Sequence, residues 1–303
     1  MEYSSELYRY LFDLDASGMP EKKLRNGLVG NYRTKRIQSG DLLEYEIYPI
    51  WNTYAEFRKA KSRETTESQK RQNAKDAAKR FGRKVHANFS DGCHVSLTYD
   101  HCATEAEACH DAVLYIRRLR RQARKAGQEI KYMYVVEWSE NAERAHIHMF
   151  IVGADRDACE AAWPHGFVNA DRLRKNDKLL TEICAYLTKG PRGRRRWNCS
   201  KNLEEPKQKT SDKILSRRKV AKICADCATD GQSLFEELNP GFRLIEPIEP
   251  KYSEYVAGAY IYVRMRRDAP DNRTPKGARP RAITRARSGE SSEGAGTSET
   301  KYR

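Results

Sequence analysis

Two histidines separated by a single residue lie in the segment HIHMFIV, residues 146–152. The segment alternates like a β-strand, so His146 and His148 are expected to project from one face. The preceding segment, residues 131–138, has the same pattern, and the short connection predicts a hairpin that brings the carboxylate of Glu137 beside both imidazoles. Such a set leaves open positions on a divalent cation, Mg²⁺ or Mn²⁺, and therefore favours a catalytic metal site. The alternative is an exposed strand face that tolerates histidine and ends in a surface carboxylate.

A tyrosine and a lysine stand three residues apart further along the chain, in the segment LLTEICAYLTKG. The segment is expected to be helical, which would put Tyr186 and Lys189 on one face. A phenol is a poor nucleophile at neutral pH, but beside a polarised phosphate and an ammonium group it can attack and form a phosphotyrosine ester. A half-buried tyrosine with a solvent-reaching lysine is the alternative, and the same spacing at Tyr32 and Lys35 shows how common the pattern is.

A basic run that ends in tryptophan follows Lys189, and its members are Arg192, Arg194, Arg195, Arg196 and Trp197. Such a run is typical of single-strand binding, in which cations contact the phosphate backbone and a base stacks on the indole. A solvated loop is the alternative. The whole chain carries 57 Lys and Arg against 42 Asp and Glu, a formal net charge of +15. Because basic side chains gain affinity for nucleic acid by displacing counterions, we expect a polyanionic partner.

The elements that must position these residues alternate along the chain. A helix that follows a strand at 93–99 is expected to begin with a capping box formed by Thr104 and Glu107. This alternation favours an α/β (α+β) domain. The remaining expected elements are strands at 41–51, about 166–173 and 252–264, and helices within 54–83, about 155–163, about 177–189 and 211–228.

Composition limits the class of protein. With 303 residues, 39% of them hydrophobic, the chain is long enough for a real core. No run approaches the roughly 18 apolar residues of a spanning helix, so we expect a cytoplasmic protein that does not enter the membrane. The eight cysteines are scattered, which favours reduced thiols. Only Cys224 and Cys227 have metal-ligand spacing, and without a second pair they do not favour a structural zinc site.

Taken together and in order, these segments resemble the rolling-circle replication initiators of the HUH endonuclease superfamily, in particular the filamentous-phage gene II type. The resemblance spans roughly residues 41–225, and its specificity lies in the order and spacing of its motifs. The segments that carry it are HVSLTY (94–99), Glu137 before HIHMFI (146–151), YLTK (186–189) and RRWNCSKNL (195–203).

The resemblance implies a role for each matched residue. His146, His148 and Glu137 would be metal ligands, Tyr186 the nucleophile and Lys189 its electrostatic partner. Leu97 and Thr98 would belong to the first motif, on a strand beside the site, whereas His94 and Ser96 receive no role. The implied fold is a central antiparallel sheet flanked by helices, with a ferredoxin-like or RRM-like core.

Four regions are expected along the chain. They are an N-terminal strand and basic helical region (1–84), the endonuclease core (85–205), an extension with a basic helix and a Tyr-rich strand (206–264) and a disordered basic tail (265–303). The tail prediction rests on its near absence of apolar residues and its many charged, Pro, Gly and Ser residues.

The implied function is origin nicking, which leaves a 5′-phosphotyrosine and a free 3′-OH that primes replication. The chain has no G-x-x-x-x-G-K-[ST] segment, so a host helicase and polymerase are implied partners alongside single-stranded or origin DNA. Closing the circle needs a second nucleophile, for which the alternatives are the second protomer of a homodimer, a water or a distant tyrosine. A relaxase, a single-strand transposase, a DNA-binding regulator without catalysis and a scaffold that acts through its tail are the alternatives.

Overall fold

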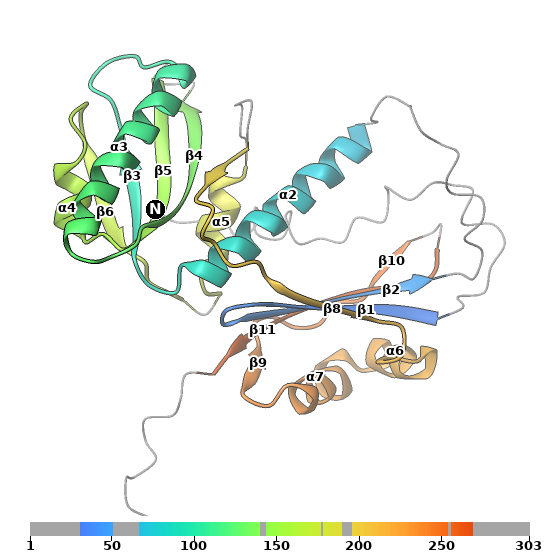
Figure 1. Cartoon of the computed structure of the whole chain (residues 1–303). Coiled ribbons are helices and arrows are strands. Elements are labelled where there is room, and N and C mark those ends of the chain that lie inside the picture. Colours follow the sequence, from blue (N-terminus) through green and yellow to red (C-terminus); the bar gives the residue numbers. More distant parts are fainter. Residues whose placement is uncertain are drawn as a thin grey trace, which may run out of the picture. The chain divides into compact units, whose positions relative to one another are not determined.

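The computed structural model describes residues 31–50, 67–139, 144–176, 178–189, 196–253 and 256–268. Their strands form two antiparallel sheets with helices packed on them, as Figure 1 shows. The predicted α+β class is therefore confirmed. No helix in these ranges is both long enough and apolar enough to cross a lipid bilayer.

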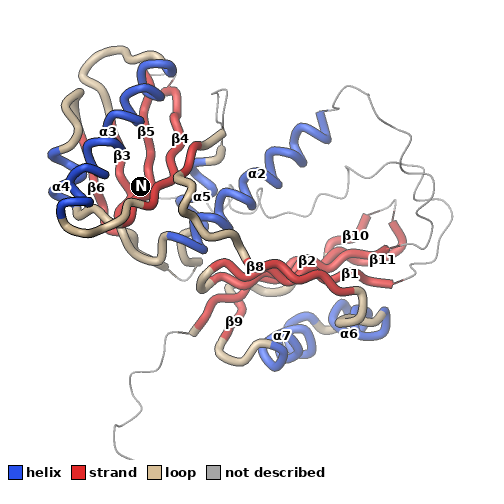
Figure 2. Tube along the Cα trace, viewed as in Figure 1, coloured by secondary structure: helices blue, strands red, loops and turns tan. Residues whose placement is uncertain are grey.

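The first sheet, called the site sheet below, has five strands in the order β6-β3-β5-β4-β7 (Figure 2). Its strands are β3 Cys93–Leu97, β4 Lys131–Ser139, β5 Arg144–Val152, β6 Val168–Arg172 and β7 Asn198–Cys199. The first four correspond to the strands that hydrophobic alternation predicts. The predicted hairpin is also present, because β4 and β5 pair antiparallel along their whole length.

Helix α3, Glu105–Lys125, packs on one face of the site sheet. Its N-terminus has the predicted capping box, in which the Thr104 hydroxyl accepts from the Glu107 backbone and the Glu107 carboxylate accepts from the Thr104 backbone. Its buried stripe includes Ile116 and Leu119 and packs against alternate residues of β3 and β5. Burying each such side chain stabilises the fold by roughly 1.5–3 kcal/mol. The shorter α4, Arg156–Ala161, also contributes to this core through Cys159.

Two helices pack on the opposite face of the site sheet. They are α2, Glu67–Asn88, and α5, Thr181–Leu187. Phe81 and Phe89 of α2 both contact Phe150 of β5, with ring centroids 6.1 and 5.8 Å apart. Leu187 of α5 joins the same apolar cluster. The amphipathic part of the basic segment predicted at 54–83 is thus a packed helix, and residues 51–66 lie outside the described ranges.

The second sheet has the order β10-β11-β2-β1-β8, and β9 also pairs with β11. Helices α6, Arg217–Ala225, and α7, Gln232–Leu238, pack on it with the π-helical turn η4, Cys227–Gly231 (Figure 2). The strands are β1 Asn31–Ser39, β2 Leu42–Ile50, β8 Lys207–Ser211, β9 Phe242–Leu244, β10 Lys251–Ser253 and β11 Val256–Arg267.

This sheet corrects two sequence predictions. It also shows that Tyr32 and Lys35, which share the spacing of Tyr186 and Lys189, lie in the strand β1. The helix predicted at 211–228 begins at Arg217, after β8, because Ser216 caps it. Residues 265–267, which are predicted to belong to the tail, lie in β11, where Met265 is fully buried opposite Leu43.

The four predicted regions are not separate in this sheet, although their boundaries stay a prediction. Strands from the N-terminal region pair with β8 and β11 of the C-terminal extension. Residues 269–303 of the predicted tail lie outside the described ranges.

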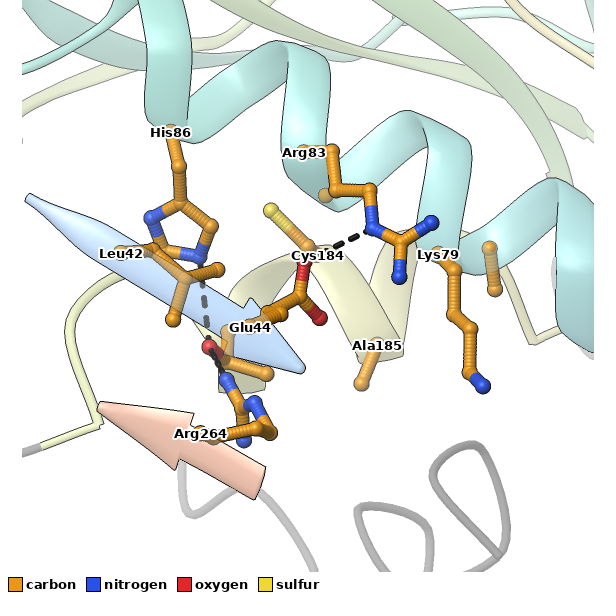
Figure 3. Close-up of a pocket in the computed structure, with 11 residues that line it drawn as sticks. Leu42, Glu44, Lys79, Arg83, His86, Cys184, Ala185 and Arg264 are labelled. Atoms are coloured by element: carbon orange, nitrogen blue, oxygen red, sulfur yellow. Dashed lines mark hydrogen bonds and ion pairs between the residues drawn. The ribbon is translucent and has the colours of Figure 1, made fainter. Parts of the chain in front are cut away.

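A buried polar cluster joins α2 and α5 to the second sheet (Figure 3). Arg83 of α2 donates from Nε to Glu44 of β2 at 2.7 Å and from Nη2 to Glu46 at 2.6 Å. In the same cluster, Arg264 of β11 donates to the hydroxyl of Thr181, the first residue of α5. The start of α5 is therefore fixed by a side chain of the second sheet.

Candidate active site

Strand register places the predicted residues on one face of the site sheet. Residues that pair across strands project to the same side, and Glu137 pairs with His146, while His148 pairs with Ser96. Ser96 in turn pairs with Asn169 of β6. All five side chains therefore project from the face opposite α3, which is called the site face below.

His148 lies at the centre of the site face and is buried. Its Nε2 lies 3.2 Å from Oε2 of Glu137, and its Nδ1 lies 3.1 Å from the hydroxyl of Ser96. The ring of His94 stacks on it, with centroids 5.5 Å apart and planes 2° from parallel. Because both nitrogens are engaged and the ring is stacked, the orientation of His148 is fixed.

The electrostatics of the site favour an ionised Glu137. Its hydrogen bond with His148 holds the pKa of this carboxyl below the usual range, and the charges of His146 and Lys189 act in the same direction. Burial opposes these effects without cancelling them. The site face thus presents an anionic carboxylate within reach of two imidazoles and a lysine.

Tyr186 reaches this group from α5. Its ring meets the ring of His148 edge to face, with centroids 6.3 Å apart and planes at 89°. Burial and the nearby Glu137 charge both raise the pKa of Tyr186. Neighbouring Cys184 and Leu187 are buried in the apolar cluster, which fixes the helix that carries the phenol. Lys189 follows α5 with an exposed side chain.

The helix that carries Tyr186 is shorter than predicted. The segment 177–189 was expected to be helical throughout, but α5 begins at Thr181. Leu179 has a φ of +59°, a left-handed conformation that interrupts a right-handed helix before Thr181. The helical prediction is right for Tyr186 and wrong for the first turn and for Lys189, because α5 ends at Leu187.

Whether these side chains fit a divalent cation depends on the donor atoms. Two adjacent ligands of an octahedral ion with bonds of roughly 2.0–2.1 Å lie roughly 3 Å apart. Nε2 of His148 and Oε2 of Glu137 have this separation, and Ser96 holds the other nitrogen of His148 as an outer-shell group would. Across the described ranges, however, no cluster of three or more His, Cys, Asp and Glu side chains is arranged to hold a metal. The pair fits a metal, and His146 as third ligand stays a prediction.

Residues 92–191 match the model of a family of replication-associated proteins, described as the ORF2 and gene II protein type. This match supports a replication initiator family. The matched segment contains the site-face residues from β3 to α5, among them Glu137, His148 and Tyr186. No curated protein and no solved structure matches the chain significantly.

The structure separates the other predicted residues into different environments. Leu97 is fully buried against α3 and has a packing role, whereas the Thr98 hydroxyl donates to the Phe167 carbonyl at 3.0 Å. Arg196 is exposed, while Trp197 is partly buried, with its ring centroid 5.6 Å from that of Phe81. The Trp197 ring thus packs in the core, and base stacking on it stays a prediction. Arg192, Arg194 and Arg195 lie outside the described ranges.

Sequence reasoning missed two residues that hold His148. His94 and Ser96 received no role, yet one stacks on the imidazole and the other contacts its Nδ1. Burial lowers the pKa of His94 to about 4, and the neighbouring His148 adds to this effect, so the stacked ring is neutral at neutral pH. Their alternation in HVSLTY places both on one strand face, but only the strand order shows that this face meets His148.

Proposed function

We propose that the protein is a replication-associated nickase of the HUH type, which cuts one DNA strand at an origin to start rolling-circle replication. The observation that carries the proposal is the convergence of Glu137, His148 and Tyr186 on the site face. This convergence lies inside the segment that matches replication-associated proteins. The net charge of +15 suits a DNA substrate.

In the proposed reaction, the phenol oxygen of Tyr186 attacks the phosphorus of a phosphodiester in a single strand. A bond forms between this oxygen and phosphorus, the bond to the 3′ oxygen breaks, and the phenol proton ends on the departing 3′ hydroxyl. The products are a 5′-phosphotyrosine and a free 3′-OH. Because one phosphodiester replaces another, the reaction is reversible and can also rejoin strands.

Each neighbouring side chain has a part in this step. Glu137, His148 and His146 would hold a divalent cation, Mg²⁺ or Mn²⁺, whose Lewis acidity polarises a phosphoryl oxygen. Ser96 and His94 keep the imidazole of His148 in place. Lys189 sets a positive charge near the site, which would offset the charge that develops on the phosphate.

The test is a covalent-adduct assay on denaturing gels, with labelled single-stranded origin DNA and Mn²⁺. We expect a protein-linked band with the wild type and none with Tyr186→Phe or with EDTA. Tyr132→Phe is the matched control, because Tyr132 is a partly buried tyrosine that packs on the α3 side of the same sheet. Tight binding without any adduct would instead support a DNA-binding regulator that does not cut.

The proposed role has consequences for partners. Single-stranded origin DNA would be the substrate, and a host helicase and polymerase would unwind and extend the nicked strand. A relaxase or a single-strand transposase would use the same chemistry. Origin DNA that supports adduct formation and primer extension in one reaction distinguishes replication from these alternatives.

A further inference from the structure

The site face is covered unevenly. The apolar cluster with α2 and α5 includes Met133, Val135 and Phe150, which belong to β4 and β5. On the edge strand β6, by contrast, Asn169 and Asp171 are exposed. Both lie on the site face, because Asn169 pairs with Ser96 and Asp171 pairs with His94. The half of the site face beside His148 is therefore open.

A large apolar side chain stands at the end of this open half. Phe167 is 71% exposed, the highest value among the exposed large hydrophobic residues of the described ranges. It directly precedes Val168, which packs toward the α3 side, so the ring of Phe167 projects from the site face. Single exposed apolar residues are common on proteins, so exposure alone does not indicate a role for Phe167. Its position relative to the candidate site does.

The backbone fixes Phe167 beside the candidate site. Its carbonyl accepts hydrogen bonds from the backbone nitrogen of Thr98 at 2.9 Å and from the Thr98 hydroxyl at 3.0 Å. Gly166, just before it, has a φ of +142°, and a Cβ there would lie 2.7 Å from the Thr98 carbonyl oxygen. Only glycine therefore allows this close approach of the two segments.

Strand register extends this alignment to the candidate metal ligands. Leu97 pairs with Ile147, so Thr98, one step further, lies opposite His146, which pairs with Glu137. Phe167, Thr98, His146 and Glu137 thus form one row across four strands. Since neighbouring strands lie about 4.8 Å apart, the backbone of Phe167 lies roughly 10 Å from that of His146.

A candidate backbone contact lies further along the same chain segment. Arg174 is exposed, and with His94 and Asp171 it lines a hollow of about 170 Å³. Asp171 is four residues beyond Phe167, roughly 13 Å along the strand. Arg172 pairs with Cys93, so its side chain projects toward the α3 side instead. Proteins bind single strands by stacking bases on aromatic rings and holding the backbone with cations.

We propose that Phe167 is a stacking platform for an unpaired base of the DNA strand that is bound at the candidate site. The proposal rests on the proposed function for its choice of ligand. The ring would stack on a base near the reacting phosphodiester, and Arg174, further along the open half, would contact the backbone beyond it. Phe167 is thus a binding residue and takes no part in the bond-breaking step.

The test is equilibrium binding of single-stranded origin DNA in EDTA, followed by fluorescence anisotropy, so that no cleavage is required. Stacking of one base is worth about 5- to 150-fold in affinity, and we expect Phe167→Ala to weaken binding within this range. Phe167→Trp, which keeps an aromatic ring, should bind as tightly as the wild type. Tyr252→Ala is the matched control, because Tyr252 is 67% exposed and belongs to the second sheet, and it should leave the affinity unchanged.

A second arm identifies the stacked base. Oligonucleotides with a single abasic nucleotide at successive positions should show one position near the cleavage site where the wild type loses affinity and Phe167→Ala does not. If Phe167→Ala binds every oligonucleotide as tightly as the wild type, the platform is refuted. If binding depends on Phe167 but no covalent adduct forms, the nickase proposal is refuted and the stacking proposal stands. If Phe167→Ala binds as tightly as the wild type and the adduct forms normally, the stacking proposal is refuted and the nickase proposal stands.

Discussion

The contact between Thr181 and Arg264 makes a measurable prediction about how the second sheet supports α5. The Thr181 hydroxyl accepts from the guanidinium of Arg264, and Nε2 of His86 lies 3.2 Å from the same oxygen. The three residues are 2%, 0% and 7% exposed. Thr181→Val removes the hydroxyl and keeps the shape of the side chain, so it leaves a buried cation and a buried imidazole without this partner.

The expected loss follows from the two contacts. A hydrogen bond to a charged group contributes about 1.5–3 kcal/mol, and a neutral one contributes about 1 kcal/mol. Thr181→Val should therefore lower the free energy of unfolding by about 3 kcal/mol. Thr181→Ser keeps the hydroxyl and removes one methyl group, which should cost about 1 kcal/mol.

Urea unfolding at about pH 7.5, followed by tryptophan fluorescence, measures both variants. The DNA-adduct assay on the same samples would show whether Tyr186 loses its position when the start of α5 is loosened. We expect Thr181→Val to form the adduct more slowly than Thr181→Ser at equal DNA occupancy. If the two variants unfold within about 0.5 kcal/mol of each other, the error of such a measurement, the reasoning about this buried contact is wrong.

Two further predictions concern single histidines and their partners. Burial lowers the pKa of His86 to about 3 from 6.5, with Lys175 adding to the effect, so the unfolded chain takes up a proton that the folded chain does not as the pH falls below 6.5. The stability that neutral His86 contributes is therefore lost toward acid, by about 2 kcal/mol between pH 7.5 and 5. Urea unfolding at both pH values should show a loss about 2 kcal/mol larger in the wild type than in His86→Gln, because His94 titrates in both proteins. Ser96→Ala releases Nδ1 of His148 and should raise the Mn²⁺ concentration needed for half-maximal adduct formation about 10- to 100-fold, with little change in DNA affinity in EDTA; an unchanged Mn²⁺ requirement would show that Ser96 does not orient the imidazole.

Local patterns were sufficient for the centre of the site. The β4–β5 hairpin follows from alternation and a short connection, and it places Glu137 opposite His146 as predicted. The capping box of α3 depends on Thr104 and Glu107 alone and is present. These features need contacts only between residues close in the sequence, which is why the sequence alone predicts them.

The features that the sequence did not predict depend on long-range pairing. Strand β8 is polar and mostly exposed, so no hydrophobic pattern indicates that it pairs with β1. The contact between Thr181 and Arg264 joins residues 83 positions apart, and nothing local to either one indicates it. In the sequence Phe167 looks like an ordinary apolar strand residue. Only the strand order shows that it lies on an open face next to the site.

The most direct test of the central claim is to locate the covalent link itself. The wild-type protein is incubated with origin DNA and Mn²⁺, the DNA is trimmed with nuclease, and the tryptic peptides are sequenced by mass spectrometry. The account predicts a nucleotide joined through its 5′ phosphate to Tyr186, in the peptide that contains α5. A nucleotide on any other residue, or cleaved DNA without a protein link, would contradict it.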